Sequence, residues 1–235
     1  MNIRFTPLLF ITALLAISFR IPSPPVLRYP PRSGGWVSLF DGKTLQGWRG
    51  YRHLPTSGWD VEGGTIHCKG RGHGVMGTDL VTDKEYRNFE LQLEWKISRA
   101  GNSGILFHVN EKYPNPYFTG PEYQIIDEKN YPGKLEDWEL TGVNYAMEVP
   151  KYRPIRPAGA WNQTRILVKD SLVEHWLNGV KILSYHMWTP NWEKLKEAGK
   201  WKDYPEYGMS RTGHISLQNH GDQVWFRNIR IRILP

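Results

Sequence analysis

The sequence predicts an all-β protein, a jelly-roll sandwich of two antiparallel sheets with one short helix in a long loop. Short segments that alternate apolar and polar residues recur along the chain, most regularly over residues 89–97. Gly and Pro, 23 and 17 in number, interrupt the chain too often for long helices. The 11 Trp, 12 Tyr and 8 Phe provide enough apolar surface for a packed core, which excludes an intrinsically disordered chain.

Residues 1–20 have the pattern of a secretory signal peptide, with a basic start at Arg4 and a short apolar run. The run is too short to span a bilayer comfortably. A proline-rich spacer follows over residues 21–35. We therefore expect a single domain over residues 36–235, periplasmic or secreted, with no membrane span after signal removal. Because Cys68 is the only cysteine, no internal disulfide is expected.

The formal net charge is +7, and the basic and acidic residues are interspersed. A nucleic-acid-binding protein concentrates Lys and Arg on one stripe, so nucleic acid is not an expected partner. Arg227, Arg230 and Arg232 alternate with other residues near the end of the chain, a spacing that predicts the outer face of a last strand.

Turn signals define two of the expected hairpins. A Glu-Gly-Gly turn joins two strands within residues 58–67, and Asn178-Gly179 is typical of a type I′ turn. A single short helix is expected over residues 192–198, within a loop that spans 187–213. The other expected strands cover residues 36–40, 89–97, 103–109, 122–127, 143–148, 164–169, 172–177, 180–185, 214–219 and 224–234.

Alternation also assigns side chains to faces. Over residues 103–109 it places Ile105, Phe107 and Val109 toward the core and His108 on the opposite face. The polar faces of several strands carry more functional groups than solvation requires, although each carboxylate taken alone fits an ordinary solvated strand position. These candidate residues are Glu90, Glu94, His108, Glu122, Gln124, Gln218 and His220.

Such residues beside aromatic rings such as Trp161 are typical of carbohydrate sites. Sugars present apolar C–H faces to rings and hydroxyl groups to amides, carboxylates and imidazoles. A metal site is not expected, since the histidines lack a familiar ligand spacing and Cys68 has no partner cysteine. No cofactor is predicted, and a hard divalent cation such as calcium stays open because such sites leave little sequence trace.

Several runs of residues together resemble the 3-keto-disaccharide hydrolase domain family, formerly a domain of unknown function. In order and spacing they cover nearly all of residues 36–234. The runs are LEWKI at 93–97, GNSGI at 101–105, EYQIID at 122–127, GAWN at 159–162, EHWLNG at 174–179, GHISLQNHG at 213–221 and FRNI at 226–229.

The resemblance implies a concanavalin A-like jelly roll, often secreted, from bacteria that degrade glycans or glycosides. Some members are described as cleaving glycosidic bonds of sugars first oxidised at C3 by a partner oxidoreductase. The chain differs from the commonest family pattern at Asn219, where many members have Asp, and at His108, where Arg is expected.

A ketone at C3 acidifies the hydrogen at C2, so a general base could start β-elimination of the C1 substituent, and water addition would complete a net hydrolysis. We expect Glu122 or His108 as the base and Glu94 or His220 as the acid. The residues expected to bind or orient the substrate are Glu90, Asn102, Gln124, Trp161, His175, Gln218 and Arg227.

Two alternatives stay open. A paired-carboxylate glycoside hydrolase would cleave unoxidised linkages with two acidic residues on either side of the bond. A non-catalytic, lectin-like module would bind unmodified glycans and release no product. Product analysis on oxidised and unoxidised glycosides separates the three functions.

Overall fold

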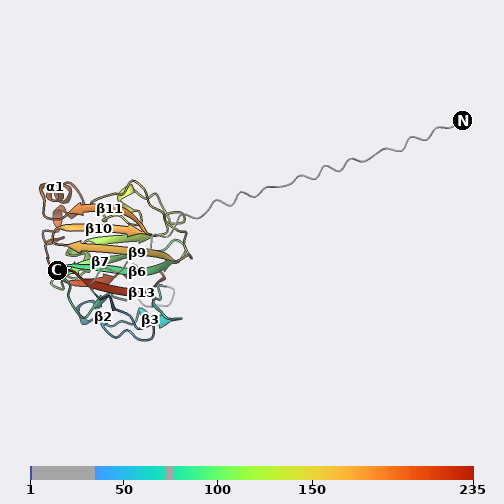
Figure 1. The fold of residues 1–235 in the computed structure, drawn as a ribbon, viewed down its shortest axis with the longest axis horizontal. Coiled ribbons are helices and arrows are strands. Elements are labelled where there is room, and N and C mark those ends of the chain that lie inside the picture. Colours follow the sequence, from blue (N-terminus) through green and yellow to red (C-terminus); the bar gives the residue numbers. More distant parts are fainter. Residues whose placement is uncertain (2–34, 72–76) are drawn as a thin grey trace.

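The computed structural model describes residue 1, residues 35–71 and residues 77–235, and these form a sandwich of two antiparallel sheets (Figure 1). The predicted jelly-roll fold class is confirmed. The predicted signal peptide and nearly all of the spacer lie outside the described residues. Within the described part of the chain, no helix is long and apolar enough to cross a membrane.

The large sheet contains the longest strands of the molecule, and Figure 1 shows several of them side by side. Its order is β11-β10-β9-β6-β13-β4-β3, and β1 also pairs with β13. The bounds are β1 Val37–Ser38, β3 Trp59–Glu62, β4 Thr65–Cys68, β6 Phe89–Ile97, β9 Asn162–Lys169, β10 Leu172–Leu177, β11 Val180–His186 and β13 Val224–Ile233.

The small sheet has the order β2-β5-β12-β7-β8. Every pairing in both sheets is antiparallel. The bounds are β2 Trp48–Gly50, β5 Leu80–Thr82, β7 Asn102–Val109, β8 Glu122–Ile126 and β12 His214–Leu217. The remaining elements are α1 Pro190–Ala198 and the 3-10 helices η1 Tyr51–His53, η3 Pro116–Phe118, η4 Asp137–Glu139 and η5 Lys200–Asp203.

The core lies between the two sheets, where the inward residues of each strand pack together. Trp95 from the large sheet and Phe107 from the small sheet are both fully buried there. The alternation predicted for β6 holds, with the apolar positions buried and several polar positions partly exposed. The expected Asn178-Gly179 turn is present, and both residues have positive φ, 48° and 85°.

The long loop over residues 187–213 is anchored by aromatic packing. Its helix α1 begins after Thr189, whose side chain accepts a hydrogen bond from the main-chain N–H of Trp192. Trp192, Trp201 and Tyr207 are fully buried, and the rings of Trp201 and Tyr207 stack with centroids 3.9 Å apart. This packing gives the loop fixed contacts with the core, and the Trp201 indole N–H donates to the Tyr145 carbonyl at 2.9 Å.

Two details of the strand prediction are wrong. Residues 143–148 form turns rather than a strand, with a single bridge between Asn144 and Tyr123. In β7 the register with β12 shifts near His108, which has φ 53°. Beyond this bulge, the side chains that alternation assigns to the outer face point to the core, and those assigned to the core point outward. His108 therefore contacts the core residues Phe89 and Phe107, whereas Val109 packs on the other side of the sheet.

Candidate active site on the small sheet

The outer face of the small sheet, turned away from the core, carries a group of polar residues. In β8 the alternate residues Tyr123 and Ile125 face the core, so Glu122 and Gln124 lie on the outer face. Ser216 of β12 lies on the same face, since its neighbours in the strand belong to the core. Glu122 and Gln124 are only 4% and 2% exposed. Buried polar groups on a sheet face need an explanation in hydrogen bonds or function.

Glu122 lies across the neighbouring strand at Gly104. A Cβ atom at position 104 would overlap the Glu122 carboxylate oxygen and would lie 2.8 Å from its Cδ. A side chain there would displace the carboxyl group. Gly104 therefore provides the space in which Glu122 is held against the backbone.

Burial raises the pKa of Glu122 to about 8. The positive charge of Lys200 and a hydrogen bond from the Gln218 side chain act in the opposite direction, while the charge of Asp79 raises the pKa further. A carboxyl group with a pKa close to neutrality can both accept and return a proton at physiological pH. Glu122 therefore has the properties of a general acid–base residue.

Asp79, which precedes β5, connects this face to the loop after β12. Its carboxylate accepts hydrogen bonds from the Asn219 main-chain N–H at 2.9 Å and from the Ser216 hydroxyl at 3.4 Å. Burial raises the pKa of Asp79 to about 7. Because these bonds occupy both of its carboxylate oxygens, Asp79 is better suited to position the loop than to contact a substrate.

The loop over residues 218–222 places the Gln218 amide beside Glu122. The Gln218 main-chain N–H donates to the Gly104 carbonyl at 2.9 Å, which fixes its side chain near the carboxyl group. Gln218 Oε1 is buried and has no hydrogen-bond partner among the described residues. Asn219 Nδ2 is also buried without a partner, but it is packed against the backbone of Gly58 and Gly77, away from the Glu122 carboxyl group. The Gln218 oxygen is an acceptor beside Glu122, so it could bind a hydroxyl group of a substrate.

A second set of contacts connects Gln124 to His220. Gln124 Nε2 donates to Asn102 Oδ1 at 3.4 Å, and the Asn102 main-chain N–H donates to Asp222 Oδ2 at 3.0 Å. Partial burial lowers the pKa of His220, and the nearby Asp222 carboxylate opposes this effect. His220 is exposed, so its imidazole can reach a bound ligand.

Lys200 brings a cation to the site from η5. Its ammonium lies 4.4 Å from the ring centre of Tyr145 and 4.8 Å from that of Trp201. A hydrogen bond of 3.0 Å from the main-chain N–H of Tyr145 to the main-chain carbonyl of Glu122 positions Tyr145. Partial burial lowers the pKa of Lys200, and the negative charge of Glu122 opposes that shift. Lys200 and Glu122 are therefore close enough for each to affect the pKa of the other.

Four of the predicted site residues lie on the other side of the sandwich. Glu94 and Arg227 are paired at 2.8 Å on the outer face of the large sheet, where the Arg227 guanidinium lies 3.9 Å from the ring centre of Trp161. Glu90 is buried on the same face and forms ion pairs with Arg165 and also with Arg232. The structure does not bring these residues to Glu122.

The predicted residues His108 and His175 lie in packed positions. His108 Nε2 is 2.8 Å from the Arg87 carbonyl oxygen, and burial lowers the pKa of His108. His175 is fully buried between Tyr123 and Tyr185, and burial lowers its pKa to about 4. Both imidazoles have structural surroundings and neither faces the Glu122 group.

The structure thus brings together five of the predicted residues, Glu122, Gln124, Asn102, Gln218 and His220, and adds others. Asp79 and Lys200 were not among the candidates. Asp79 precedes a strand of only three residues, and Lys200 begins a 3-10 helix of only four residues, so neither belongs to a periodic pattern. The remaining signal for Lys200 is its place beside Trp201 in an aromatic-rich segment.

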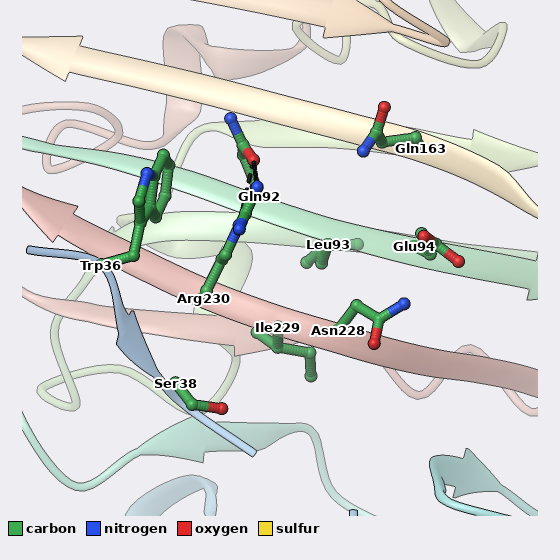
Figure 2. Close-up of a pocket in the computed structure, with 9 residues that line it drawn as sticks. All are labelled: Trp36, Ser38, Gln92, Leu93, Glu94, Gln163, Asn228, Ile229 and Arg230. Atoms are coloured by element: carbon green, nitrogen blue, oxygen red, sulfur yellow. Dashed lines mark hydrogen bonds between the residues drawn. The ribbon is translucent and has the colours of Figure 1, made fainter. Parts of the chain in front are cut away.

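Two hollows lie away from the Glu122 group. One, of about 460 Å³, opens on the outer face of the large sheet (Figure 2). The other, of about 400 Å³, lies beside Trp95, Asp127 and Pro157. We favour the Glu122 face as the active site because its carboxyl groups are buried and have raised pKa values, whereas Glu94 in the first hollow is already paired with Arg227.

Among the described residues, no three His, Cys, Asp or Glu side chains are grouped so that they could hold a metal ion. The arrangement around Glu122 offers a carboxyl group, an imidazole, an ammonium group and several amides. These groups can transfer protons and stabilise a developing negative charge on oxygen.

Comparison with known proteins gives consistent matches over the domain. Residues 35–232 match the family described as the 3-keto-alpha-glucoside-1,2-lyase-like domain. A 3-keto-disaccharide hydrolase of Bacteroides thetaiotaomicron is 36% identical over an alignment length of 237, and the match covers 88% of this chain and 81% of the relative.

Solved structures of two relatives come from Parabacteroides distasonis, and each is named as a candidate glycosyl hydrolase. The first, at 1.70 Å resolution, has 45% sequence identity and a TM-score of 0.80, covering 86% of this chain and 94% of the relative. The second has 27% sequence identity and a TM-score of 0.65, and the match covers 85% of this chain and 100% of the relative.

Proposed function

This chain belongs to the 3-keto-α-glucoside-1,2-lyase-like family, and from that membership we propose that it is a carbohydrate-active hydrolase that cleaves 3-keto-glycosides at the Glu122 site. The observation that carries the proposal is the buried carboxyl group of Glu122, whose pKa is raised to about 8 by burial. Cleavage by elimination needs one group that removes a proton from carbon and later returns it. A pKa close to the working pH suits both tasks.

The first step is proton abstraction. The Glu122 carboxylate takes the hydrogen from C2, and the electron pair of that bond moves toward the C3 ketone, which becomes an enolate. A cation or hydrogen-bond donor near the ketone oxygen stabilises this charge. Lys200 is suited to that role because it is the nearby cation that already lowers the pKa of Glu122.

The second step breaks the glycosidic bond. The enolate electrons re-form the ketone and make a C1–C2 double bond, and the C1–O pair leaves with the departing oxygen. An acid must give that oxygen a proton, and the exposed imidazole of His220 is our candidate. Water then adds its hydroxyl to C1, and Glu122 returns a proton to C2, so the net reaction is hydrolysis.

The amide groups of the site would hold the sugar. Gln218 Oε1, buried without a partner among the described residues, is an acceptor that a sugar hydroxyl could satisfy. Gln124 and Asn102 extend this polar surface along the sheet. Bound hydroxyl groups would satisfy these atoms and fix C2 relative to Glu122.

The proposed substrate requires an upstream reaction. A sugar with a C3 ketone must come from an oxidoreductase that oxidises a glycoside at C3, and we propose such an enzyme as a functional partner. We also propose export to the periplasm or the exterior, which N-terminal sequencing of the mature protein in fractionated cells would test. No cofactor is proposed, and turnover after dialysis against a chelator tests a calcium requirement.

The decisive experiment offers the full chain a set of 3-keto-glycosides and their unoxidised parents in D₂O, with products identified by mass spectrometry. Elimination and readdition would place one deuterium at C2 of the sugar product. Glu122→Gln, which is nearly isosteric, should reduce turnover by about 10² to 10⁴. Cleavage of the parents without deuterium at C2 would instead support a paired-carboxylate hydrolase, and binding without cleavage would support a lectin-like module.

A further inference from the structure

The outer face of the large sheet has a hollow of about 460 Å³, here called the outer hollow. Its volume lies within the range of about 300–1,000 Å³ typical of small-molecule sites. The sheet lies on the side of the sandwich opposite to the Glu122 face, so the two sites do not share a ligand. The residues that define the outer hollow here are Trp36, Gln92, Glu94, Gln163, Asn228 and Arg230.

A bulge in β13 helps to form the outer hollow. Arg227 pairs with Glu94 and Arg230 with Gln92, so two residues of β13 stand opposite one residue of β6. Asn228 in this bulge has φ 53°, a conformation that non-glycine residues adopt infrequently. Bulges commonly redirect a side chain beside a binding site. Here the bulge places the exposed Asn228 amide at the hollow while Ile229 remains 1% exposed in the core.

Tryptophan rings lie on this polar face instead of in the core. Trp36 lines the hollow, and the Arg230 guanidinium lies 4.7 Å from its ring centre. Trp161 lies beside the hollow, with Arg227 at 3.9 Å from its ring centre. Half-buried tryptophans on an outer face provide flat apolar surface beside polar groups, the combination that sugar rings require.

The guanidinium groups at the outer hollow already have hydrogen-bond partners, whereas two amides are free. Arg227 donates to Glu94 at 2.8 Å, and Arg230 donates twice to Gln92 Oε1, at 3.1 and 2.7 Å. The side chains of Gln163 and Asn228 make no hydrogen bond to other described residues, and both are exposed. Figure 2 shows these two amides and Glu94 at one end of the hollow, with Trp36 at the other.

We propose that the outer hollow binds an uncharged oligosaccharide, as a second carbohydrate site separate from the Glu122 site. The amides of Gln163 and Asn228 would bind hydroxyl groups, and the indole rings would contact C–H faces. An uncharged ligand is favoured because the free groups are neutral amides, Arg227 is paired with Glu94, and Arg230 donates to the Gln92 amide oxygen. A chain bound there would keep the protein on a glycan while the opposite face acts on smaller sugars, which raises the local substrate concentration.

Titration calorimetry on the full chain carrying Glu122→Gln tests the proposal without turnover, with maltohexaose and cellohexaose as probes. The altered chain carries Asn228→Gly and Gln163→Ala in addition to Glu122→Gln. Glycine at position 228 removes the amide and accepts the positive φ. The control adds Lys169→Ala, an exposed change on the same strand as Gln163. We expect saturable binding of at least one probe, a loss of affinity of about tenfold or more in the altered chain, and no loss in the control.

Three results would overturn the proposal: no binding of either probe, equal affinity in the altered chain, or tighter binding of an oligogalacturonate than of both neutral probes. A change in oligomeric state, seen by size-exclusion chromatography when the two amides are removed, would mark the face as an interface between copies instead. With Glu122 intact, Asn228→Gly and Gln163→Ala should leave turnover of a 3-keto-disaccharide unchanged. Failure of the Glu122 mechanism would therefore appear separately from failure of the outer hollow.

Discussion

Glu122 occupies the space that a side chain at position 104 would fill. The two residues come from adjacent strands, β7 and β8, and a Cβ atom at Gly104 would lie 2.8 Å from Cδ of Glu122. The carboxyl group is thus held against the sheet in a buried position, which raises its pKa to about 8. Absence of a side chain on one strand therefore contributes to the acid–base properties of a residue on the next.

Gly104→Ala should reduce turnover while the chain still folds. The added methyl group would displace the Glu122 carboxyl group, because the neighbouring backbone cannot move away without breaking the pairing of β7 and β8. Overpacking of this kind typically costs about 1–3 kcal/mol of stability. We expect turnover to fall by about tenfold or more, measured by steady-state kinetics with a 3-keto-glycoside.

Gly35→Ala is the matched control for this substitution, because no atom lies within 4 Å of a Cβ placed at position 35. It should retain both the stability and the activity of the wild type. Wild-type turnover in Gly104→Ala would contradict the role that we assign to the position of the Glu122 carboxyl group.

The raised pKa of Glu122 also predicts how stability depends on pH. Its folded-state pKa, about 8, is above the ordinary value of 4.5 expected in the unfolded chain. The folded state therefore holds this proton more tightly, and the stabilising contribution is complete below pH 4.5 and lost as the pH rises to about 8. Compared with Glu122→Gln, the wild type should lose stability across this window, as measured by urea unfolding at a series of pH values.

Glu197→Gln, on the exposed face of α1, gives the control for removal of one carboxyl group. Its stability should follow the wild type across the same window. A constant difference between the wild type and Glu122→Gln from pH 4.5 to pH 8 would show that Glu122 has no raised pKa in the folded protein.

Lys200→Met should move the pH dependence of catalysis. The ammonium group of Lys200 lowers the pKa of Glu122, so its removal should raise that pKa further. If the Glu122 carboxylate is the base, kcat/KM rises with pH as the carboxyl group loses its proton, and the midpoint should lie at higher pH in the variant. The pH profile of kcat/KM on a 3-keto-glycoside measures the shift.

Two further variants separate charge from structure. Lys200→Arg keeps the positive charge and should restore the midpoint toward the wild-type value. Lys202→Met changes an exposed lysine on the same 3-10 helix and should leave the profile unchanged. An unchanged midpoint in Lys200→Met would exclude an electrostatic effect of Lys200 on Glu122.

The sequence predicts most of the fold because its longer strands carry a clear period. The alternation in β6 and the Asn178-Gly179 turn each lead to the observed element. The three-residue strands β2 and β5 are too short to show a period. Residues 143–148 look like a strand but form turns, since apolar composition alone does not separate a strand from a buried turn.

The site is less predictable because alternation assigns a residue to a face but not to a sheet. Glu94 and Glu122 have similar patterns in the sequence, yet the sandwich places them on opposite outer faces. The bulge at His108 reverses the faces at one strand end, which strict alternation cannot anticipate. Asp79 and Lys200 reach the site through tertiary packing, so local sequence carries little sign of them.

His175 should make the protein less stable in mild acid. Burial lowers its folded-state pKa to about 4, below the ordinary value of 6.5, so the unfolded chain binds the proton first. The stabilising contribution is complete above pH 6.5 and is lost as the pH falls toward 4. In His175→Gln this dependence should disappear, whereas His186→Gln, an exposed imidazole on β11, should retain it. Urea unfolding between pH 4 and pH 7 measures the slope in each chain, so a lower overall stability of His175→Gln does not affect the test. Equal slopes in the wild type and His175→Gln would mean that the buried imidazole takes up a proton as readily in the folded state as in the unfolded chain.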